Sequence, residues 1–437
     1  MTAHGSLGRR QFLRTAAAGI GALGAPVIAP PQSVRAAGQG DQQWIRSSQR
    51  LPEPVVQLPT DRLSRKGPRK RIAAITTAYF KYSHADDIIT KFIEGYGVVG
   101  RIHNPHCDVV SLYIEQLPDS DIGLGMAERY GIPLYKTPTD ALTLGGKDLA
   151  VDGVLLIGEH GRYPSNDKGQ RLYPRRRLFQ EIVEVFRRTG KSVPVFNDKH
   201  LSYSWDHAKW MYAQSHELDF PMMAGSSVPV TWRRPPLELR KGTPLDGALS
   251  VGYAGVESYG FHTLECLQVF AERRRGGESG VKAVQCLQGK AAWKAMREGR
   301  WRKDLLDAAL APVPTGHGDV MDIDRGAVVF LIDYADGFRG TAYLSRGHVN
   351  EFAFGGQVAG SSQPFGTWFY LPKPQRDHFS FLCNHIETMF LTGQPSYRVE
   401  RTYLTTGMLT FLLDSLKAGG KRIETPQLAN IRYTPIS

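Results

Sequence analysis

Residues 76–84, with the sequence TTAYFKYSH, hold the first side chains whose types and spacing could do chemistry. They lie between a short apolar run and a segment with apolar residues at helical spacing, which predicts a turn between a strand and a helix. Thr76 and Thr77 could donate hydroxyl groups to a phosphate, and Lys81 and His84 could bind an anion at the start of the helix. These four are candidate cofactor-binding residues.

The same turn contains no glycine, although dinucleotide-binding turns use glycines so that the backbone can approach a pyrophosphate closely. Its three aromatic residues add bulk at this place. Two interpretations stay open. The turn binds a nicotinamide cofactor in a modified way, or it binds no dinucleotide and its aromatic side chains pack together or line a substrate cleft.

Further polar residues follow other strand-like runs. Glu159, His160 and Arg162 come after the run VLLIG, and Glu115 lies near the end of the run that begins at Asp108. Because ligands of open α/β sheets bind beyond the carboxyl ends of the strands, Glu159, His160 and Arg162 are candidate cleft residues, and Glu159 and His160 are candidate cofactor-binding residues. A purely structural loop is the alternative. Glu115 is a candidate ribose-binding acid, at a longer spacing from the turn than the ~20 residues usual for dinucleotide-binding sequences.

The elements that must position these residues alternate between strand and helix over residues 71–200. Apolar runs alternate with amphipathic segments such as RRRLFQEIVEVFRRTG, which Gly190 closes. This alternation predicts an α/β fold with a Rossmann-like, doubly wound parallel sheet. Strand-like runs after residue 280, with a hairpin turn at Asp336-Gly337, predict a C-terminal α+β part with an open, mostly antiparallel sheet.

The composition excludes several classes of function. The chain has 437 residues and a net charge of +12, and its basic residues lie in short, dispersed clusters that indicate solvated loops rather than nucleic-acid binding. The four cysteines form no C-x-x-C pair, and His103 and His106 do not have the spacing of a zinc motif. We therefore expect buried thiols and no metal site.

The first 36 residues have the composition of an export signal. Arg9 and Arg10 precede Phe-Leu after one residue, a weakly apolar segment follows, and Val34-Arg35-Ala36 fits a small-residue cleavage site. The pattern resembles a twin-arginine signal. It predicts a bacterial protein that the twin-arginine export machinery delivers folded to the periplasm or otherwise outside the cytoplasm. No other stretch is long and apolar enough to span a membrane.

The predicted boundaries follow from these patterns. Residues 1–36 form the signal and 37–70 a linker or arm. Residues 71–205 form the Rossmann-like nucleotide-binding domain, 206–395 a C-terminal domain for substrate binding and oligomerisation, and 396–437 a closing helix and tail.

Over roughly residues 70–433 the order of elements resembles the family of glucose–fructose oxidoreductase, inositol dehydrogenase and MocA. The segments that carry the resemblance are AERYGIPLYKTPTDAL, VPVFNDKHLSYSW and SYGFHTLECL, together with the closing helices. Where the family has Glu-Lys-Pro at a strand end, this chain has Asp198-Lys199-His200. Where the family has Asp-x-Gly-x-His at a helix start, this chain has Ser258 to His262 and keeps the Gly and the His.

The resemblance implies roles for these residues. In the family the lysine and the histidine flank a sugar hydroxyl beside the nicotinamide, so Lys199 and His262 are catalytic candidates and Asp198 is a cofactor-binding candidate. Glu257, one position before the replaced aspartate, could supply the missing carboxylate. The resemblance also implies NAD or NADP as cofactor, a small carbohydrate-like substrate, and a homo-oligomer formed through the open face of the C-terminal sheet.

Three functions stay open at this point. The first is an exported oxidoreductase-like protein that acts on a carbohydrate or polyol with a nicotinamide cofactor bound in a modified way. The second is a non-redox pseudo-enzyme that binds a glycan or a partner. The third is a cofactor-independent lyase or isomerase that uses the same lysine and histidine, because the fold alone does not choose among these chemistries.

Overall fold

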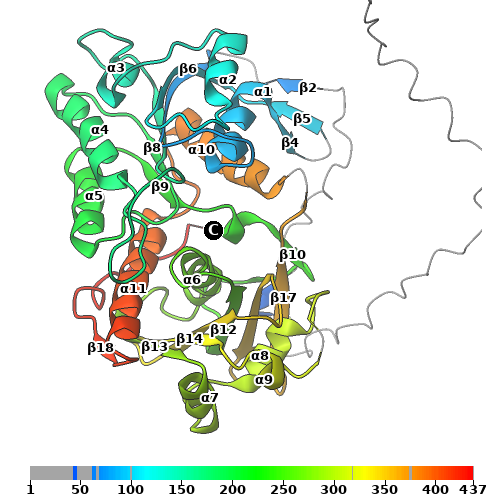
Figure 1. The fold of residues 1–437 in the computed structure, drawn as a ribbon. Coiled ribbons are helices and arrows are strands. Elements are labelled where there is room, and N and C mark those ends of the chain that lie inside the picture. The colour runs from blue at the N-terminus through cyan, green and yellow to red at the C-terminus, as the bar shows by residue number, and fades with distance from the viewer. Residues whose placement is uncertain are drawn as a thin grey trace, which may run out of the picture. The chain divides into compact units, whose positions relative to one another are not determined.

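A computed structural model describes residues 43–46, 62–64, 68–98, 101–316, 318–373 and 376–436. The predicted signal and most of the predicted arm lie outside these residues. All of the described residues belong to one compact unit, whose two large sheets are drawn in Figure 1.

The first sheet is parallel throughout, and its five strands are rich in buried aliphatic residues. Its central strands read as near-continuous apolar runs because helices cover both of its faces. An isolated parallel bridge between Leu112 and Leu134 extends the sheet beyond its first strand. The predicted doubly wound sheet is confirmed, and its strand order is β6 (Cys107–Ile114), β3 (Lys70–Thr76), β7 (Gly153–Ile157), β8 (Val195–Asp198) and β9 (Met222–Gly225).

Separate helix layers cover the two faces of this sheet (Figure 1). A long amphipathic helix buries Leu178, Phe179, Ile182 and Phe186 and ends at Gly190, whose φ of +63° is the left-handed conformation expected at a helix end. One layer contains α3 (Pro138–Thr143), α4 (Arg175–Thr189) and α5 (Trp205–Glu217). The other contains η1 (Asp86–Thr90), α1 (Lys91–Glu94), α2 (Gly123–Tyr130) and α10 (His378–Thr392).

The second sheet is mixed and mostly antiparallel, as predicted. Only its β12–β15 pair is parallel, and β14 and β15 form the hairpin expected at Asp336-Gly337. Its order is β10 (Trp232–Arg234), β17 (Phe365–Tyr370), β16 (Phe352–Val358), β12 (Leu245–Tyr253), β15 (Arg339–Ser345), β14 (Val328–Tyr334), β13 (Val281–Gln288) and β18 (Ile423–Glu424).

Helices also cover both faces of the second sheet. On one face lie α6 (Ser258–Ala271) and α11 (Val399–Lys417). On the other lie α7 (Lys290–Arg297), α8 (Lys303–Leu310) and α9 (Val320–Ile323), with Trp293 and Leu306 buried against the strands. The sheet is open at its edges, but α7 to α9 occupy the face through which the resemblance implied oligomerisation.

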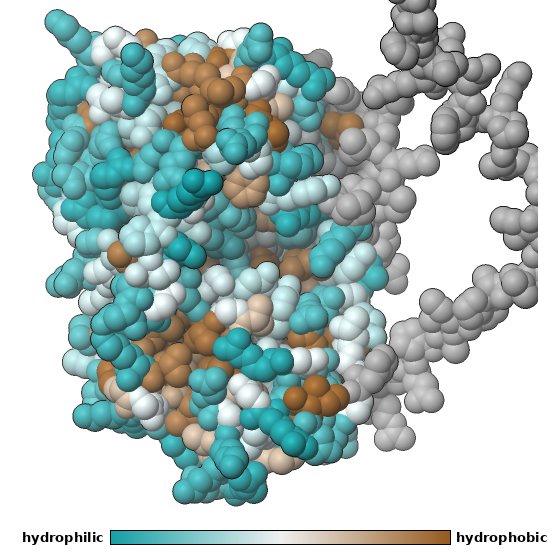
Figure 2. Space-filling view, in the orientation of Figure 1, coloured by the Kyte–Doolittle hydropathy of each residue, from teal (hydrophilic) through white to brown (hydrophobic). Residues whose placement is uncertain are grey.

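Short elements complete the described chain. They are β1 (Ile45–Arg46) with β11 (Glu238–Leu239), the sheet of β2 (Arg62–Ser64), β5 (Arg101–Asn104) and β4 (Tyr96–Val98), and η2 (Val228–Val230). All four cysteines are buried outside disulfides. Within the described ranges no helix is long and apolar enough to cross a membrane, and no group of His, Cys, Asp or Glu side chains is arranged to hold a metal ion. The face shown in Figure 2 is largely hydrophilic, with a hydrophobic patch over α2, where Leu124 is exposed.

Candidate active site

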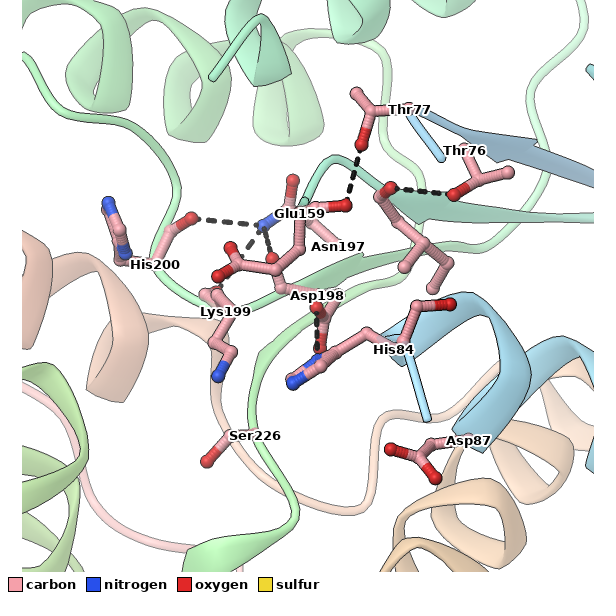
Figure 3. Close-up of polar contacts among 12 residues, drawn as sticks. Thr76, Thr77, His84, Asp87, Glu159, Asn197, Asp198, Lys199, His200 and Ser226 are labelled. Carbon is pink, nitrogen blue, oxygen red and sulfur yellow. Dashed lines mark hydrogen bonds and ion pairs between the residues drawn. The ribbon is translucent and has the colours of Figure 1, made fainter. Parts of the chain in front are cut away.

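Lys199 stands at the carboxyl end of β8 in an unusual backbone conformation. Its φ is +68°, a left-handed value that costs a non-glycine residue of order 1–3 kcal/mol. The backbone holds this shape because Lys199 N–H donates to the carbonyl of Gly225, at the end of β9, over 3.0 Å. This turn directs the side chain away from the sheet, beside the Asp198–His84 pair (Figure 3). Strain of this kind is typical of functional sites.

His262, in the first turns of α6, meets the lysine. Lys199 Nζ lies 2.7 Å from His262 Nε2, and His262 Nδ1 lies 3.0 Å from a carboxylate oxygen of Glu265. Because the carboxylate only accepts, we assign the ring proton to Nδ1, which leaves Nε2 to accept from the lysine ammonium. Burial and the charge of Lys199 lower the pKa of His262 below its usual value, which favours this neutral form.

Glu265 is fixed beneath the histidine by the end of β9. Ser226 donates to it from both its backbone N–H, over 2.9 Å, and its hydroxyl, over 2.5 Å. Gly225, directly before this serine, allows the Glu265 carboxylate to lie this close to the backbone, since a Cβ at Gly225 would lie 2.8 Å from Glu265 Oε1. Lys199, His262 and Glu265 therefore form a continuous proton relay.

A second pair flanks the relay. Asp198 is fully buried, and its Oδ2 lies 2.7 Å from His84 Nδ1. Burial raises the pKa of Asp198, which favours the protonated carboxyl group, and lowers the pKa of His84, which favours the neutral imidazole. One proton between the two groups therefore leaves both uncharged. The His84 ring lies 5.4 Å from that of His160, and burial also lowers the pKa of His160.

The third group surrounds a fully buried arginine, Arg175. Its guanidinium pairs with Glu159 and donates to His200 Nε2 over 3.2 Å. Burial opposes ionisation of Glu159, but the charges of Arg175 and Lys199 outweigh it and hold its pKa below the usual value. Glu257 lies 3.7 Å from His200, and burial raises its pKa to about 7.

The residues proposed to bind phosphate in the β3–η1 turn have other partners. Each threonine hydroxyl carries one proton, and both are directed at backbone carbonyls: Thr76 donates to Ile157 O over 3.1 Å and Thr77 to Glu159 O over 2.7 Å. Tyr79 fills the space beneath the turn, fully buried, with its hydroxyl 2.8 Å from Thr90 Oγ1.

Several backbone donors of this turn are also engaged. Phe80 N–H donates to the Ser83 hydroxyl over 3.2 Å, and Tyr82 N–H donates to the carboxylate of Asp86 over 2.8 Å. Asp86 pairs with the exposed Lys81 over 3.1 Å. A carboxylate of the chain itself thus occupies the start of the helix, where a fold of this kind would place a pyrophosphate.

The loop between β7 and α4, residues 158–174, crosses the ends of the neighbouring strands. Gln116, after β6, accepts from Arg162 N–H over 2.8 Å, and Glu115 accepts from the hydroxyl of Tyr163 over 2.7 Å and pairs with Arg177. The tip of the loop reaches α11, where Lys168 pairs with Asp414. The β7–α4 loop therefore spans the region from β6 to α11. Its Tyr163 already donates a hydrogen bond to Glu115, the candidate ribose-binding acid.

The structure thus brings together most of the predicted site residues and separates two of them. Lys199 and His262 are in contact, with Glu257 nearby around His200. Asp198, His84, His160 and Glu159 flank them. Lys81 and Glu115 lie in peripheral ion pairs. Ser226, Glu265 and Arg175 were not among the site residues predicted from the sequence. The spacing of Glu265 three residues after His262 on one helix was the available signal for it.

The fold of this chain is similar to that of several solved structures. No family model and no curated protein matches the chain. Among solved structures it is similar to GenD2 from gentamicin A biosynthesis in complex with NAD, with a TM-score of 0.52 and 13% identity over 84% of this chain and 99% of that one. It is also similar to a probable dehydrogenase from Thermotoga maritima, with a TM-score of 0.50 and 13% identity over 82% and 99% of the two chains. The fold implied by the resemblance, a Rossmann-like parallel sheet followed by a mostly antiparallel sheet, is confirmed.

Proposed function

We propose that this chain is an exported enzyme that carries out acid–base catalysis at a hydroxyl group of a carbohydrate or polyol. The observation that supports this function best is the relay from Lys199 through His262 to Glu265. The oxidoreductase-like fold and the carbohydrate chemistry of proteins with this architecture motivate the substrate class. The twin-arginine pattern at the N-terminus motivates export.

The relay can move a proton in either direction. Transfer of a proton from Lys199 Nζ to His262 Nε2 leaves a neutral amine, and Glu265 stabilises the imidazolium that forms. The amine then takes the proton of a substrate hydroxyl beside it, so that an O–H bond is replaced by an N–H bond. The reverse sequence returns a proton to a substrate oxygen. Positioned proton transfer of this kind contributes ~10²–10⁴-fold to a rate.

A nicotinamide cofactor would supply a hydride acceptor beside the substrate carbon. The β3–η1 turn does not fit the pyrophosphate of such a cofactor in the position usual for this fold, because its hydroxyl protons, its Phe80 and Tyr82 N–H groups and its helix start are already engaged. Redox chemistry would therefore need NAD or NADP bound in a modified way, away from this turn.

The same observation favours a second candidate, a cofactor-independent lyase or isomerase. The β7–α4 loop is anchored at Gln116 and Glu115, across the strand ends where a dinucleotide would lie. Lys199 and His262 need no cofactor to move protons. A binding protein without turnover is the remaining alternative.

Two measurements on the exported protein separate these functions. The first measurement identifies, by mass spectrometry, any nucleotide released from protein purified from its host. Together with the absorbance of the nicotinamide during turnover, it distinguishes redox from non-redox chemistry. Lys199→Ala is expected to abolish turnover of a carbohydrate and polyol panel, while Lys191→Ala, an exposed lysine on the preceding loop, serves as the control. Full turnover by Lys199→Ala would overturn the proposed function.

Export has its own test. Replacing Arg9 and Arg10 with lysine is expected to keep the protein in the cytoplasm, because the paired arginines are the recognition feature of this signal class. Cell fractionation and immunoblotting measure the change. Unchanged delivery outside the cytoplasm would contradict the twin-arginine route, but it would not bear on the proposed chemistry at Lys199.

A further inference from the structure

The β7–α4 loop covers the strand ends, and it also builds most of a cavity of about 680 Å³. Phe80 of the β3–η1 turn forms one wall. The other lining residues belong to the loop, and those that matter here are His160, Arg162, Tyr163, Arg171 and Tyr173. A cavity of this size accommodates a small ligand.

Two arginines give this cavity a positive charge. Two acids near the loop already have arginine partners, since Glu159 pairs with Arg175 and Glu115 with Arg177, whereas Glu257 interacts with Arg171 only through electrostatic attraction. Among the described residues, Arg162 and Arg171 form no ion pair. Within the described part of the chain, the Arg171 side chain donates one hydrogen bond, to the carbonyl of Tyr163 over 2.6 Å, so its guanidinium retains further donors.

The remaining walls are aromatic. The rings of Tyr163 and Tyr173 meet edge to face with centroids 5.6 Å apart, and Phe80 meets His160 in the same way at 5.2 Å. Such rings offer apolar faces with few hydrogen-bonding groups. They suit the C–H face of a sugar ring, while the arginines suit an anionic group attached to it.

A chain of side-chain contacts links one wall of the cavity to the relay. His160 lines it, and the ring of His160 lies 5.4 Å from that of His84, which binds Asp198 next to Lys199. His160 Nε2 is buried and lacks a hydrogen-bond partner in the described part of the chain, so a polar donor or acceptor of a ligand would satisfy it.

We propose that this cavity binds the carboxylate of a sugar acid, with Arg162 and Arg171 holding the carboxylate and Phe80, Tyr163 and Tyr173 packing on the ring. The inference rests on the proposed function, because it places the charged end of the substrate at one side of Lys199. The planar guanidinium fork matches the two oxygens of a carboxylate. A sugar phosphate or the phosphates of a dinucleotide share the anionic chemistry and are alternatives that the test separates.

The experiment is calorimetric titration of the mature full chain with glucuronate, glucose, glucose 6-phosphate and NAD. Glucuronate is expected to bind at least ~10-fold more tightly than glucose. The double variant Arg162→Ala/Arg171→Ala should lose at least ~10-fold in glucuronate affinity, because each charge-assisted hydrogen bond contributes more than a neutral one. Arg297→Ala, which removes an exposed arginine on α7, should bind like the wild type.

The outcomes also distinguish this inference from the proposed function. Equal affinity for glucuronate and glucose, or an unchanged affinity in the double variant, would overturn the sugar-acid site while leaving the Lys199 chemistry standing. Preferential binding of glucose 6-phosphate or of NAD, lost in the double variant, would assign the cavity to that ligand and overturn the inference as well. The double variant Arg162→Lys/Arg171→Lys retains both charges and serves as the charge-conserving control. A thermal midpoint of each double variant equal to that of the wild type verifies that the comparison concerns folded protein.

Discussion

At the scale of single residues, the ionisation of His262 decides whether the relay works. Burial and Lys199 lower its pKa, whereas the hydrogen bond that it donates to Glu265 raises it. His262 must be neutral to accept a proton, so activity should fall as the pH drops through this lowered pKa. Glu265→Gln removes the negative partner and should move this acidic limb to still lower pH, with a smaller kcat.

The measurement is the pH–rate profile of wild type, Glu265→Gln and His262→Gln. His262→Gln should remove the limb altogether and reduce kcat by ~10²–10⁴-fold. An acidic limb that is identical in wild type and Glu265→Gln would show that Glu265 has only a structural role.

Glu257 makes the stability of the protein depend on pH. Burial raises its pKa from 4.5 to about 7, so the folded state binds more protons than the unfolded state between these values. Its contribution to the free energy of unfolding therefore falls as the pH rises from about 4.5 to about 7 and is constant above that range. Glu257→Gln should remove this fall, of up to about 3 kcal/mol.

Urea unfolding of wild type and Glu257→Gln at pH 5 and pH 8 measures the effect. The difference in stability between the two proteins should favour the glutamine variant more strongly at pH 8. The same difference at both pH values would contradict a raised pKa at this residue.

Lys199 and His262 could be predicted because short motifs at a strand end and a helix start carry them. Ser226 and Arg175 could not, since their contacts with Glu265 and with Glu159 join separate elements of the fold. Glu115 shows the opposite case: its place after a strand predicted a ribose contact, yet the hydroxyl of Tyr163, 48 residues later in sequence, binds it.

At the scale of elements, the end of β9 supports the relay through one glycine. Gly225 has a φ of +122°, and a Cβ there would meet Glu265 at 2.8 Å and Thr402 at 3.0 Å. Gly225→Ala should displace Glu265 and lower the stability by ~1–3 kcal/mol, the usual cost of a strained backbone conformation. Gly190→Ala, at a position with φ of +63° and open space around it, is the control for a positive-φ glycine that has no contact with the relay.

Thermal unfolding and kcat measure the two effects of Gly225→Ala separately. Both variants should lower the thermal midpoint, but only Gly225→Ala should also lower kcat, because only Gly225 contacts the relay. A loss of kcat in Gly190→Ala of the same size would attribute the effect to global destabilisation instead.

Apolar runs and periodicity predicted the strands of the first sheet, β13 to β16 of the second sheet and the long helices, because burial of one face or both faces imposes a regular pattern on the sequence. They did not predict β12, a central strand of the second sheet. They also did not predict that α7 to α9 cover the second sheet. These helices are short, and their buried residues, such as Trp293 and Leu306, face strands that follow or precede them by many residues. The β7–α4 loop was equally hidden, since its anchors at Gln116 and Asp414 lie in other elements.

At the scale of the whole molecule, the C-terminal helices join the two sheets. α10 returns to the parallel sheet, where Phe390 is buried and packs against Phe92 and β7. α11 contributes Leu404 and Met408 to the core of the second sheet, whereas Tyr403 of the same helix stacks on Trp205 in the first. The two sheets should therefore unfold as one cooperative unit.

Phe390→Ala tests this coupling because it leaves a cavity at Gly153, far along the chain from the second sheet. The free energy of unfolding should fall by ~3–5 kcal/mol, the usual cost of such a truncation, and Phe390→Leu should cost less. Hydrogen exchange measured by mass spectrometry should show protection lost to the same extent in β3 and β7 and in β14 and β15. If β14 and β15 kept their protection while β3 and β7 lost theirs, the sheets would be independent domains, since a cooperative unit transmits a local cavity to every strand whose opening requires global unfolding.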